Sequence, residues 1–332
     1  MNKWTLALVI GSLLTASPVF SETEVPHSFT SGEKAVAAEV NANFEALVSH
    51  IDSLTDRIED LENELNDLRN SDVIAMNEYV SVQPDPHSAN SERIRFSGVN
   101  VQIVNGLDDT ESSNASGNLI IGYNEVRQGQ SVCSRGQFET ESECIREWAS
   151  DHRSGSHNLI VGKGNAFSGY GGIISGLNNA ISNRYATVIG GEENVAGGVN
   201  SAVMGGSSNE ALGSSTTIAG GRLNKISYDQ FSRGGAVFGG TSNSAHGSYA
   251  TVSGGTGNDA DGERSAVAGG WSNTATGKYS SVLGGGEYNE ATGRLSVVVG
   301  GVRNEASGDN SVVLGGRIKT ASGEDETIPP VN

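Results

Sequence analysis

The stretch "SAVMGGSSNEALG", residues 201–213, decides how this chain folds, because near copies of it recur along the sequence. Two further copies are "SAVAGGWSNTATG" from Ser265 and "SVVVGGVRNEASG" from Ser296, so the template is S-x-V-x-G-G-x-x-N-x-A-x-G. Its asparagine is found at Asn165, Asn179, Asn194, Asn209, Asn224, Asn243, Asn258, Asn273, Asn289 and Asn304. The successive intervals are 14, 15, 15, 15, 19, 15, 15, 16 and 15 residues. A period this regular indicates a repeat architecture.

The valine column of the template predicts a short β-strand. It holds β-branched residues that alternate with small ones, which indicates one face turned inward. Its members are Val188, Val203, Ile218, Val252, Val267, Val282, Val298 and Val313. The glycine pair that follows, from Gly190 and Gly191 through Gly315 and Gly316, predicts a turn where a side chain would clash or φ must be positive.

The second half of the template predicts a further turn. Another glycine follows the asparagine by four residues, at Gly198, Gly213, Gly247, Gly262, Gly277, Gly293 and Gly308. Asn183 replaces it in one repeat, and Asn is the residue other than Gly that best tolerates a left-handed backbone, so we expect left-handed conformations in this column. We expect the repeated asparagines to stack into a ladder that satisfies backbone groups of the turns.

These columns predict an all-β fold, a parallel β-roll or β-solenoid of about 15-residue repeats over residues 96–318. A single unit of this length cannot bury its own apolar face, whereas stacked units can. Glycine is abundant, at 46 of 332 residues, and proline is rare, at 6, which favours tight turns over collagen or a linker. Because each repeat supplies only one small β-branched residue per strand face, we expect one roll to need neighbouring chains.

Residues 35–70 carry a heptad repeat that predicts an α-helical coiled-coil stalk. One row is Phe44, Ile51, Ile58 and Leu65, and the other is Val40, Leu47, Leu54, Leu61 and Leu68. Isoleucine in one row and leucine in the other favours dimers. The segment "RIEDLE", residues 57–62, instead resembles a trimer-specifying pattern in which Arg57 pairs with Glu62. We predict a homotrimer and leave the dimer open. The trimerisation residues are Phe44, Ile51, Leu54, Arg57, Ile58, Leu61, Glu62 and Leu65.

The repeats resemble the YadA-like head repeats of trimeric autotransporter adhesins, well over residues 117–318 and from "FSGVNVQIVNG" at Phe96 more weakly. The resemblance implies a left-handed parallel β-roll, three chains side by side, and binding to host surface or matrix molecules. The order differs from that family, because here the coiled coil precedes the repeats. The family's membrane barrel has no counterpart in the 14 residues that follow Ile318.

The remaining segments predict export. Residues 1–21 combine Lys3, a short apolar run over residues 6–14 and small residues before a cut between Ser21 and Glu22, which is typical of a signal peptide. Residues 22–34 form an N-terminal segment, residues 71–95 a neck or linker, and residues 319–332 a C-terminal tail. We expect an exported protein that is extracellular, at the cell surface or periplasmic, with no transmembrane anchor of its own.

Two insertions interrupt the period. Residues 128–154 contain Cys133 and Cys144, and an even cysteine count in an exported chain predicts a disulfide between them. Residues 227–235 account for the 19-residue interval. Insertions in solenoids lie in surface loops, often on a binding face, and a covering loop without a ligand is the equal alternative.

Metal ligands are not expected. His152 and His157 flank the longer insertion, and we expect solvent-facing side chains rather than a site. The stretch "GGTGND", residues 254–259, matches the calcium β-roll motif once and has no tandem copy, so a calcium site is disfavoured.

The leading interpretation of function is an adhesin-like binding protein rather than an enzyme. No nucleophile elbow, phosphate loop, dinucleotide fingerprint or zinc-protease motif occurs, so no cofactor is expected. The net charge of −18 argues against nucleic acid. A host or matrix glycan or protein is the expected ligand, approached by variable outward positions. These are Arg222, Tyr249, Arg264, Trp271, Tyr279, Tyr288 and Arg303.

Three alternatives stay open. A purely structural surface protein would bind nothing. A carbohydrate-active β-solenoid enzyme would stack its acids in one column, whereas Glu193, Glu210, Asp259, Glu290 and Glu305 are expected to be dispersed. Ice binding would need a regular threonine array. Thr187, Thr217 and Thr251 instead share a column with alanines and valines.

Overall fold

The fold is given by a computed structural model that describes residues 24–71, 75–87, 90–134, 140–144, 147–227 and 233–330. The expected signal peptide, residues 1–21, lies outside these ranges. The chain divides into two compact units, Met1–Val101 and Gln102–Asn332, which are taken separately below.

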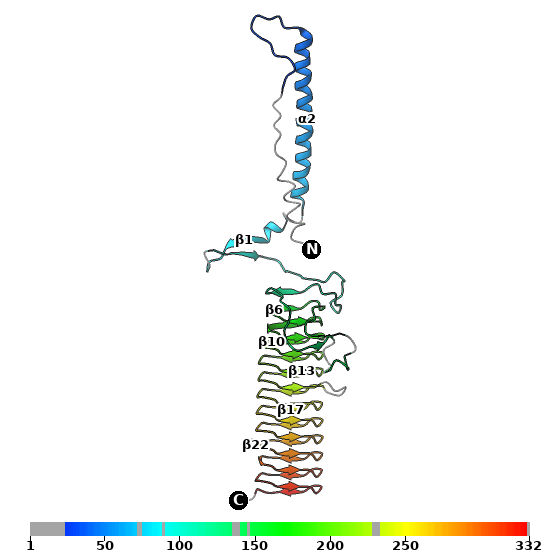
Figure 1. Ribbon diagram of the computed structural model, residues 1–332, viewed down its shortest axis with the longest axis vertical. Coiled ribbons are helices and arrows are strands. Elements are labelled where there is room, and N and C mark those ends of the chain that lie inside the picture. The colour runs from blue at the N-terminus through cyan, green and yellow to red at the C-terminus, as the bar shows by residue number, and fades with distance from the viewer. Residues whose placement is uncertain are drawn as a thin grey trace. The chain divides into compact units, whose positions relative to one another are not determined.

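The first unit is built on one long helix, α2 (Ala37–Arg69), which falls within the predicted stalk (Figure 1). A short 3₁₀ turn, η1 (Met76–Glu78), follows it. Strands β1 (Val80–Pro84) and β2 (Glu92–Phe96) then pair antiparallel, with Val80 opposite Phe96. The stretch predicted as a linker therefore contains most of a hairpin, and Pro84 is tolerated because it ends its strand. Within the described residues, no helix combines the length and apolar character needed to cross a membrane.

The second unit is a parallel β-solenoid, as the repeat predicts (Figure 1). Its first face is a 13-stranded sheet, with each strand hydrogen-bonded to the strand of the next rung. Val188 lies opposite Val203, and Val203 opposite Ile218, so the valine column is in register. The strands are β3 (Leu119–Ile121), β6 (Leu159–Lys163), β8 (Ile173–Leu177), β10 (Thr187–Glu192), β12 (Ala202–Val203), β14 (Thr217–Ile218), β16 (Ala236–Val237), β17 (Thr251–Val252), β19 (Ala266–Val267), β21 (Ser281–Val282), β24 (Val297–Val298), β27 (Val312–Val313) and β29 (Thr327–Ile328).

The second face carries the residues that follow each asparagine. It comprises two five-stranded parallel sheets, which isolated bridges through Ser244 connect. The strands are β7 (Ala166–Phe167), β9 (Ala180–Ile181), β11 (Val195–Ala196), β13 (Glu210–Ala211), β15 (Lys225–Ile226), β18 (Asp259–Ala260), β20 (Thr274–Ala275), β23 (Glu290–Ala291), β26 (Glu305–Ala306) and β28 (Thr320–Ala321). A short pair, β22 (Gly286–Glu287) and β25 (Gly301–Val302), lies at the glycine turn.

The core is a double column inside a single chain. The valine column and the alanine column of the second face, such as Val203 and Ala211, are fully buried and form one continuous cluster. Larger residues fill the same places in the earliest rungs, where Phe167 and Ile181 precede Ala196. The two columns bury each other within one chain. Short alanine and valine side chains suffice because the two faces lie close together. The residue after each member of the valine column is instead exposed in several rungs, for example Ile189 at 56%, Met204 at 54% and Phe238 at 59%, so the need for neighbouring chains stays a prediction.

The asparagines form the expected ladder. The Oδ1 atom of Asn194 accepts the backbone N–H of Asn209 at 3.0 Å, and Asn209 does the same for Asn224 at 3.0 Å. The Nδ2 of Asn209 donates to the carbonyls of Gly205 and Gly221, at 3.1 and 3.0 Å. Each amide thus ties its own turn to both neighbouring rungs, which explains how a fully buried polar side chain is tolerated.

The left-handed turn lies elsewhere than predicted. Gly198 and its equivalents do not have positive φ, and neither does Asn183. Glycine is required there because a Cβ atom at Gly198 would lie 1.9 Å from the carbonyl oxygen of Gly213 in the next rung. The left-handed residues come two positions later, with φ of 55–62°. They are Tyr185, Asn200, Ser215, Tyr249, Arg264, Tyr279, Leu295, Asn310 and Asp325. Inter-rung backbone hydrogen bonds hold them, for example Arg264 N–H to Ser248 O at 2.7 Å.

Candidate functional site

The longer insertion leaves the solenoid between β3 and β6. Leu119 pairs with Leu159, 40 residues later, whereas Leu159 pairs with Ile173 after only 14. The excursion forms a small antiparallel pair of its own, β4 (Val132–Cys133) with β5 (Trp148–Ala149). The predicted disulfide between Cys133 and Cys144 is confirmed, with a Cα–Cα distance of 5.6 Å.

Two buried side chains hold this excursion in place, Arg127 by bonds to the roll and to the excursion, and His152 by contacts within the excursion. Arg127 is 1% exposed and donates from Nε to Asn178 O at 2.8 Å and from one NH group to Ser150 O at 3.0 Å. Burial lowers the pKa of Arg127 to about 10, while the charges of Glu193 and Asp151 oppose the shift. His152 is 5% exposed, with Nε2 2.9 Å from Val132 O. The expectation of a solvent-facing His152 is wrong, because the insertion folds over the imidazole.

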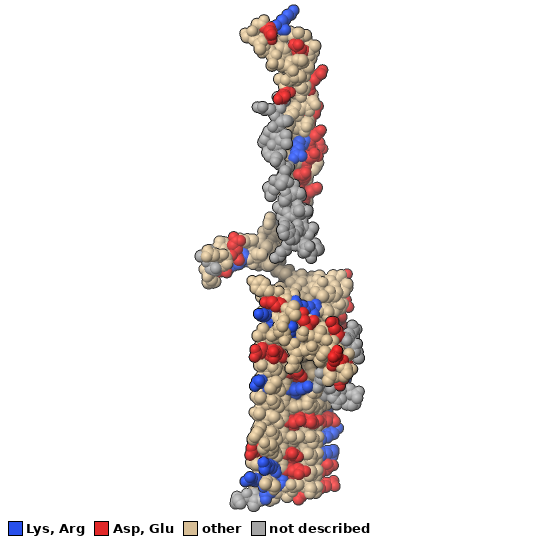
Figure 2. All heavy atoms as spheres, viewed as in Figure 1, with Lys and Arg blue, Asp and Glu red and all other residues tan. Residues whose placement is uncertain are grey.

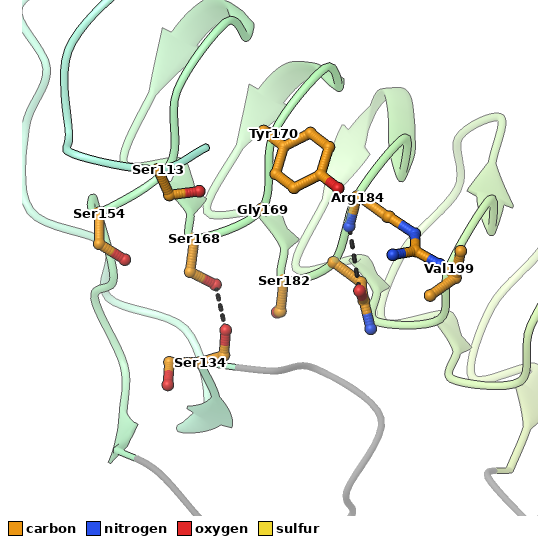
Figure 3. Close-up of a pocket in the computed structure, with 10 residues that line it drawn as sticks. Ser113, Ser134, Ser154, Ser168, Gly169, Tyr170, Ser182, Arg184 and Val199 are labelled. Carbon is orange, nitrogen blue, oxygen red and sulfur yellow. Dashed lines mark hydrogen bonds between the residues drawn. The ribbon is translucent and has the colours of Figure 1, made fainter. Parts of the chain in front are cut away.

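A pocket of about 590 Å³ lies where the excursion meets the first rungs (Figure 3). Its described lining is rich in hydroxyl groups, and the Oγ of Ser168 donates to Ser134 O at 2.8 Å. The lining residues are Ser113, Ser134, Ser154, Ser168, Gly169, Tyr170, Ser182, Asn183, Arg184 and Val199. They include no carboxylate, imidazole or thiol. The described walls of the pocket can offer hydrogen bonds, one guanidinium group and the phenol of Tyr170.

Tyr185 lies beside the pocket residue Tyr170. The two rings meet edge to face with centroids 5.5 Å apart. The hydroxyl of Tyr185 donates to Glu111 Oε1 at 3.0 Å, and this hydrogen bond is the main reason that the pKa of Tyr185 is raised. The aromatic pair is thereby tied to the loop that precedes the solenoid.

Tyr249, Arg264 and Tyr279, here called the tyrosine edge, occupy one column on three successive rungs. The guanidinium carbon of Arg264 lies 5.7 Å from the centroid of Tyr249 and 5.4 Å from that of Tyr279. Arg264 also donates to the hydroxyl of Tyr279 at 2.6 Å. Because stacked rungs place equivalent residues one above another, the left-handed turns present this row outward as a fixed array.

Trp271, Tyr288 and Arg303, here called the tryptophan edge, form a second array at the glycine turn. The ring centroids of Trp271 and Tyr288 are 5.2 Å apart, and Arg303 lies 5.5 Å from the centroid of Tyr288. Trp271 is 50% exposed and Tyr288 39% exposed, so both keep surface for a partner. On the face shown in Figure 2, Lys and Arg side chains gather near the C-terminal end of the roll.

The predicted trimerisation residues all lie on helix α2, which buries none of its residues within one chain. Ile51 is 59% exposed, and Ile58 57%. The two heptad rows are therefore apolar and uncovered in the single chain. The repeat-turn asparagines lie inside the roll instead, so they are structural rather than ligand-facing.

The acids are less dispersed than expected. Glu210, Asp259, Glu290 and Glu305 share one column of the second face, each directly after an asparagine. Lys225 interrupts this column and pairs with Glu210 at 3.4 Å. Glu290 and Glu305 are neighbours in register. The expectation that no acids stack is wrong, because the rungs place every residue that directly follows a repeat asparagine in one column.

One group of side chains was missed altogether. His246, Asp259 and Asp261 come together on the second face, although only Asp259 belongs to the "GGTGND" stretch. The signal that would have found them is the repeat itself, because His246 and Asp261 both stand three residues after an asparagine in successive rungs.

A comparison with models of known protein families gives no match to this chain, and a comparison with curated proteins gives none either.

Proposed function

We propose that this chain is an exported, adhesin-like display protein, in which a trimeric coiled coil carries β-rolls that bind a host or matrix glycan or protein. Its location would be extracellular, at the cell surface or in the periplasm. The observation that carries the proposal is the pair of exposed arrays, the tyrosine edge and the tryptophan edge, on a roll whose valine and alanine columns are buried within one chain. Tyr, Trp and Arg are the side chains that most often dominate interface energies.

Oligomerisation is supported by the uncovered apolar rows of helix α2. An exposed heptad seam is stabilised when it packs against the same seam of other chains. Three copies of each edge on one stalk would raise the effective concentration of weak contacts. The resemblance of residues 57–62 to a trimer pattern favours three chains over two.

A binding role is favoured over catalysis at the pocket, since its described walls hold no carboxylate, imidazole, amine or thiol and their one acid–base side chain is Tyr170. The disulfide of the insertion supports export into an oxidising compartment. The resemblance to the YadA-like head repeat supports the same role.

The test measures binding of the intact protein to a glycan and matrix-protein array, with variants drawn from the repeat itself. Asn200 and Asn310 occupy the column of the tyrosine edge in other rungs, so Tyr249→Asn with Tyr279→Asn keeps a residue that tolerates the left-handed backbone. Leu295→Asn, in the next rung of that column, is the matched control. For the tryptophan edge, Trp271→Thr copies Thr256, and Val302→Thr is the control.

We expect at least one ligand to bind an edge variant more weakly than the native protein, while the matched control variant binds it as the native protein does. Binding that is equally absent for every ligand tried would leave a purely structural role. Loss of binding only on deletion of residues 128–154 would move the binding site to the pocket.

A further inference from the structure

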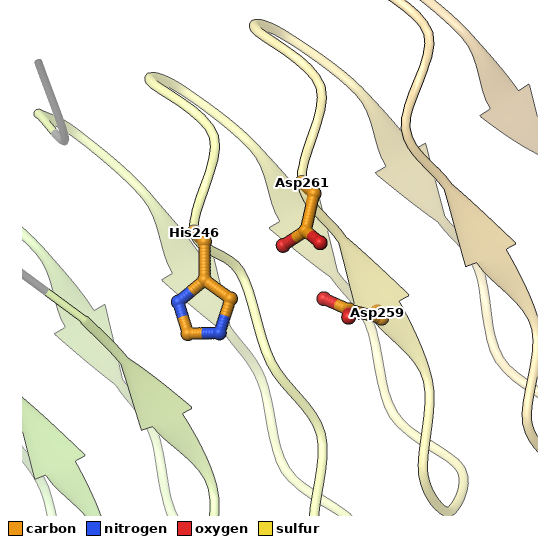
Figure 4. Close-up of side chains that lie close together, drawn as sticks. All are labelled: His246, Asp259 and Asp261. Carbon is orange, nitrogen blue, oxygen red and sulfur yellow. The ribbon is translucent and has the colours of Figure 1, made fainter. Parts of the chain in front are cut away.

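His246, Asp259 and Asp261 form a mixed cluster on the second face of the roll (Figure 4). They belong to two successive rungs, and a parallel bridge between Ser244 and Asp259 fixes the rungs against each other. One potential ligand atom from each residue lies within 4.8 Å of the other two. The carboxylates of Asp259 and Asp261 face one another, with the imidazole alongside.

One oxygen of Asp259 is poorly satisfied, although its carboxyl group has hydrogen bonds with Asp261 and Ser244. The Oδ1 atom is inaccessible to solvent and accepts no hydrogen bond. Across the described part of the chain, no Lys or Arg lies within ion-pairing distance of Asp259 or Asp261. A buried carboxylate oxygen without a partner is costly, so the site favours either a cation or a proton shared between the two carboxyl groups.

We infer that His246, Asp259 and Asp261 bind a divalent transition-metal ion of the zinc class. One imidazole nitrogen and two carboxylate oxygens are a donor set that suits Zn²⁺, whereas Ca²⁺ takes six to eight oxygen ligands. Tetrahedral bonds of about 2.0–2.1 Å would place donor atoms about 3.4 Å apart, so the cluster needs only small side-chain rotations to close. Water would complete the coordination.

The pKa of Asp259 is raised to about 7, first by burial and then by hydrogen bonding and charge from Asp261. His246 already has contacts, with Nδ1 3.3 Å from the backbone nitrogen of Ser227 and Nε2 2.5 Å from Ser244 Oγ. Coordination through Nε2 would replace the latter, and the Ser244 hydroxyl can rotate away.

The ion would cross-link two neighbouring rungs. Its ligands lie on the rung of residues 243–247 and the rung of residues 258–262, at the first turns after the 19-residue interval. An ion that binds only the folded chain stabilises that chain, by an amount that grows with the logarithm of the ion concentration above Kd. Zinc should therefore both bind and raise the melting temperature.

The experiment titrates ZnCl₂ into the chelator-treated, tag-free protein by calorimetry and follows thermal unfolding with and without the ion. Asp259→Thr and Asp261→Thr are the test variants, because threonine occupies the same columns at Thr274 and Thr276. Each should weaken zinc binding by about tenfold or more and remove the melting shift. The matched control is Glu290→Thr with Glu305→Thr, which removes a stacked acid pair that has no histidine beside it.

Substituting Co²⁺ gives a spectroscopic readout, since its absorption bands report nitrogen and oxygen ligation directly. The inference is overturned if the native protein binds zinc no more tightly than Asp261→Thr. It is also overturned if the Glu290/Glu305 control loses as much binding as the test variants, or if Ca²⁺ displaces zinc at equal concentration. If the two carboxyl groups only share a proton, zinc will not shift the melting temperature, and that result also overturns the inference.

Discussion

Helix α2 and the β-roll differ in how much of their apolar surface they bury within one chain. The roll encloses its valine and alanine columns within one chain, where Val203 and Ala211 have no exposed surface, although Ile189, Met204 and Phe238 of its outward column stay exposed. The helix buries none of its residues, and Phe44 is 62% exposed. Both segments are repetitive in sequence, but only the roll stacks its repeats on themselves.

The difference identifies apolar surface that is left for an intermolecular partner. A stack of rungs covers its inward columns by itself, whereas the heptad rows of helix α2 are uncovered within the chain, and we propose that they pack against other chains. Changes inside the roll should therefore alter the stability of one chain. Changes in the helix should alter association and leave the roll intact.

The largest effect is expected where rungs approach most closely. A Cβ atom at Gly262 would lie 2.1 Å from Gly277 O, so Gly262→Ala should cost about 3 kcal/mol in unfolding free energy. Denaturant unfolding measures this cost. The control is Gly285→Ala, because a Cβ atom at Gly285 meets nothing within 4 Å. Equal effects of the two substitutions would show that inter-rung contact does not require the glycine.

The next largest loss of unfolding free energy is expected when one asparagine of the ladder is replaced. Asn209→Leu leaves the Gly205 carbonyl and the Asn224 N–H without these partners and leaves the Gly221 carbonyl with only the Ser207 N–H, which should cost about 3 kcal/mol in total after relaxation. Thermal unfolding followed by circular dichroism is the measurement. Asn200→Ser is the control, since Asn200 is exposed and Ser215 fills the same column. A wild-type melting curve for Asn209→Leu would show that the asparagine ladder does not stabilise the roll.

The disulfide should have a smaller, local effect. Cys133→Ser with Cys144→Ser removes a bond that closes a loop of ten intervening residues, worth about 2 kcal/mol. Limited proteolysis should show faster cleavage within residues 128–154, while the melting temperature of the roll changes little. Protection equal to that of the native protein would mean that Arg127 and His152 alone hold the excursion.

The helix substitutions should leave the stability of the roll unchanged. Ile51→Asn with Ile58→Asn places polar groups in the exposed seam and should dissociate the chains. The β-sheet circular dichroism transition should stay at the native temperature. A lowered transition would indicate that the roll depends on neighbouring chains after all.

The solenoid was predictable because the repeat period can be read directly from the sequence. The valine column, the glycine pair and the asparagine each recur at nearly constant spacing, so stacking in register follows directly. The position of the left-handed residue did not follow. Glycine at position 198 is required by the nearby Gly213 carbonyl, whereas Tyr249 and Arg264 adopt positive φ because backbone hydrogen bonds impose it.

The candidate sites were only partly predictable. The disulfide followed from two cysteines in one insertion, but the burial of Arg127 and His152 depends on how that insertion folds back. The cluster of His246, Asp259 and Asp261 was missed because its residues are 13 and 15 positions apart along the chain. Aligned on the asparagine, they occupy neighbouring rungs.

The most direct test of the account is the molar mass of the mature chain in solution, measured by light scattering coupled to size exclusion. The account predicts three times the mass of one chain for the native protein, and one chain mass for Ile51→Asn with Ile58→Asn. A dimer mass would keep the seam but contradict the trimer. A native protein with the mass of a single chain would contradict the central claim that helix α2 joins the rolls into an oligomer.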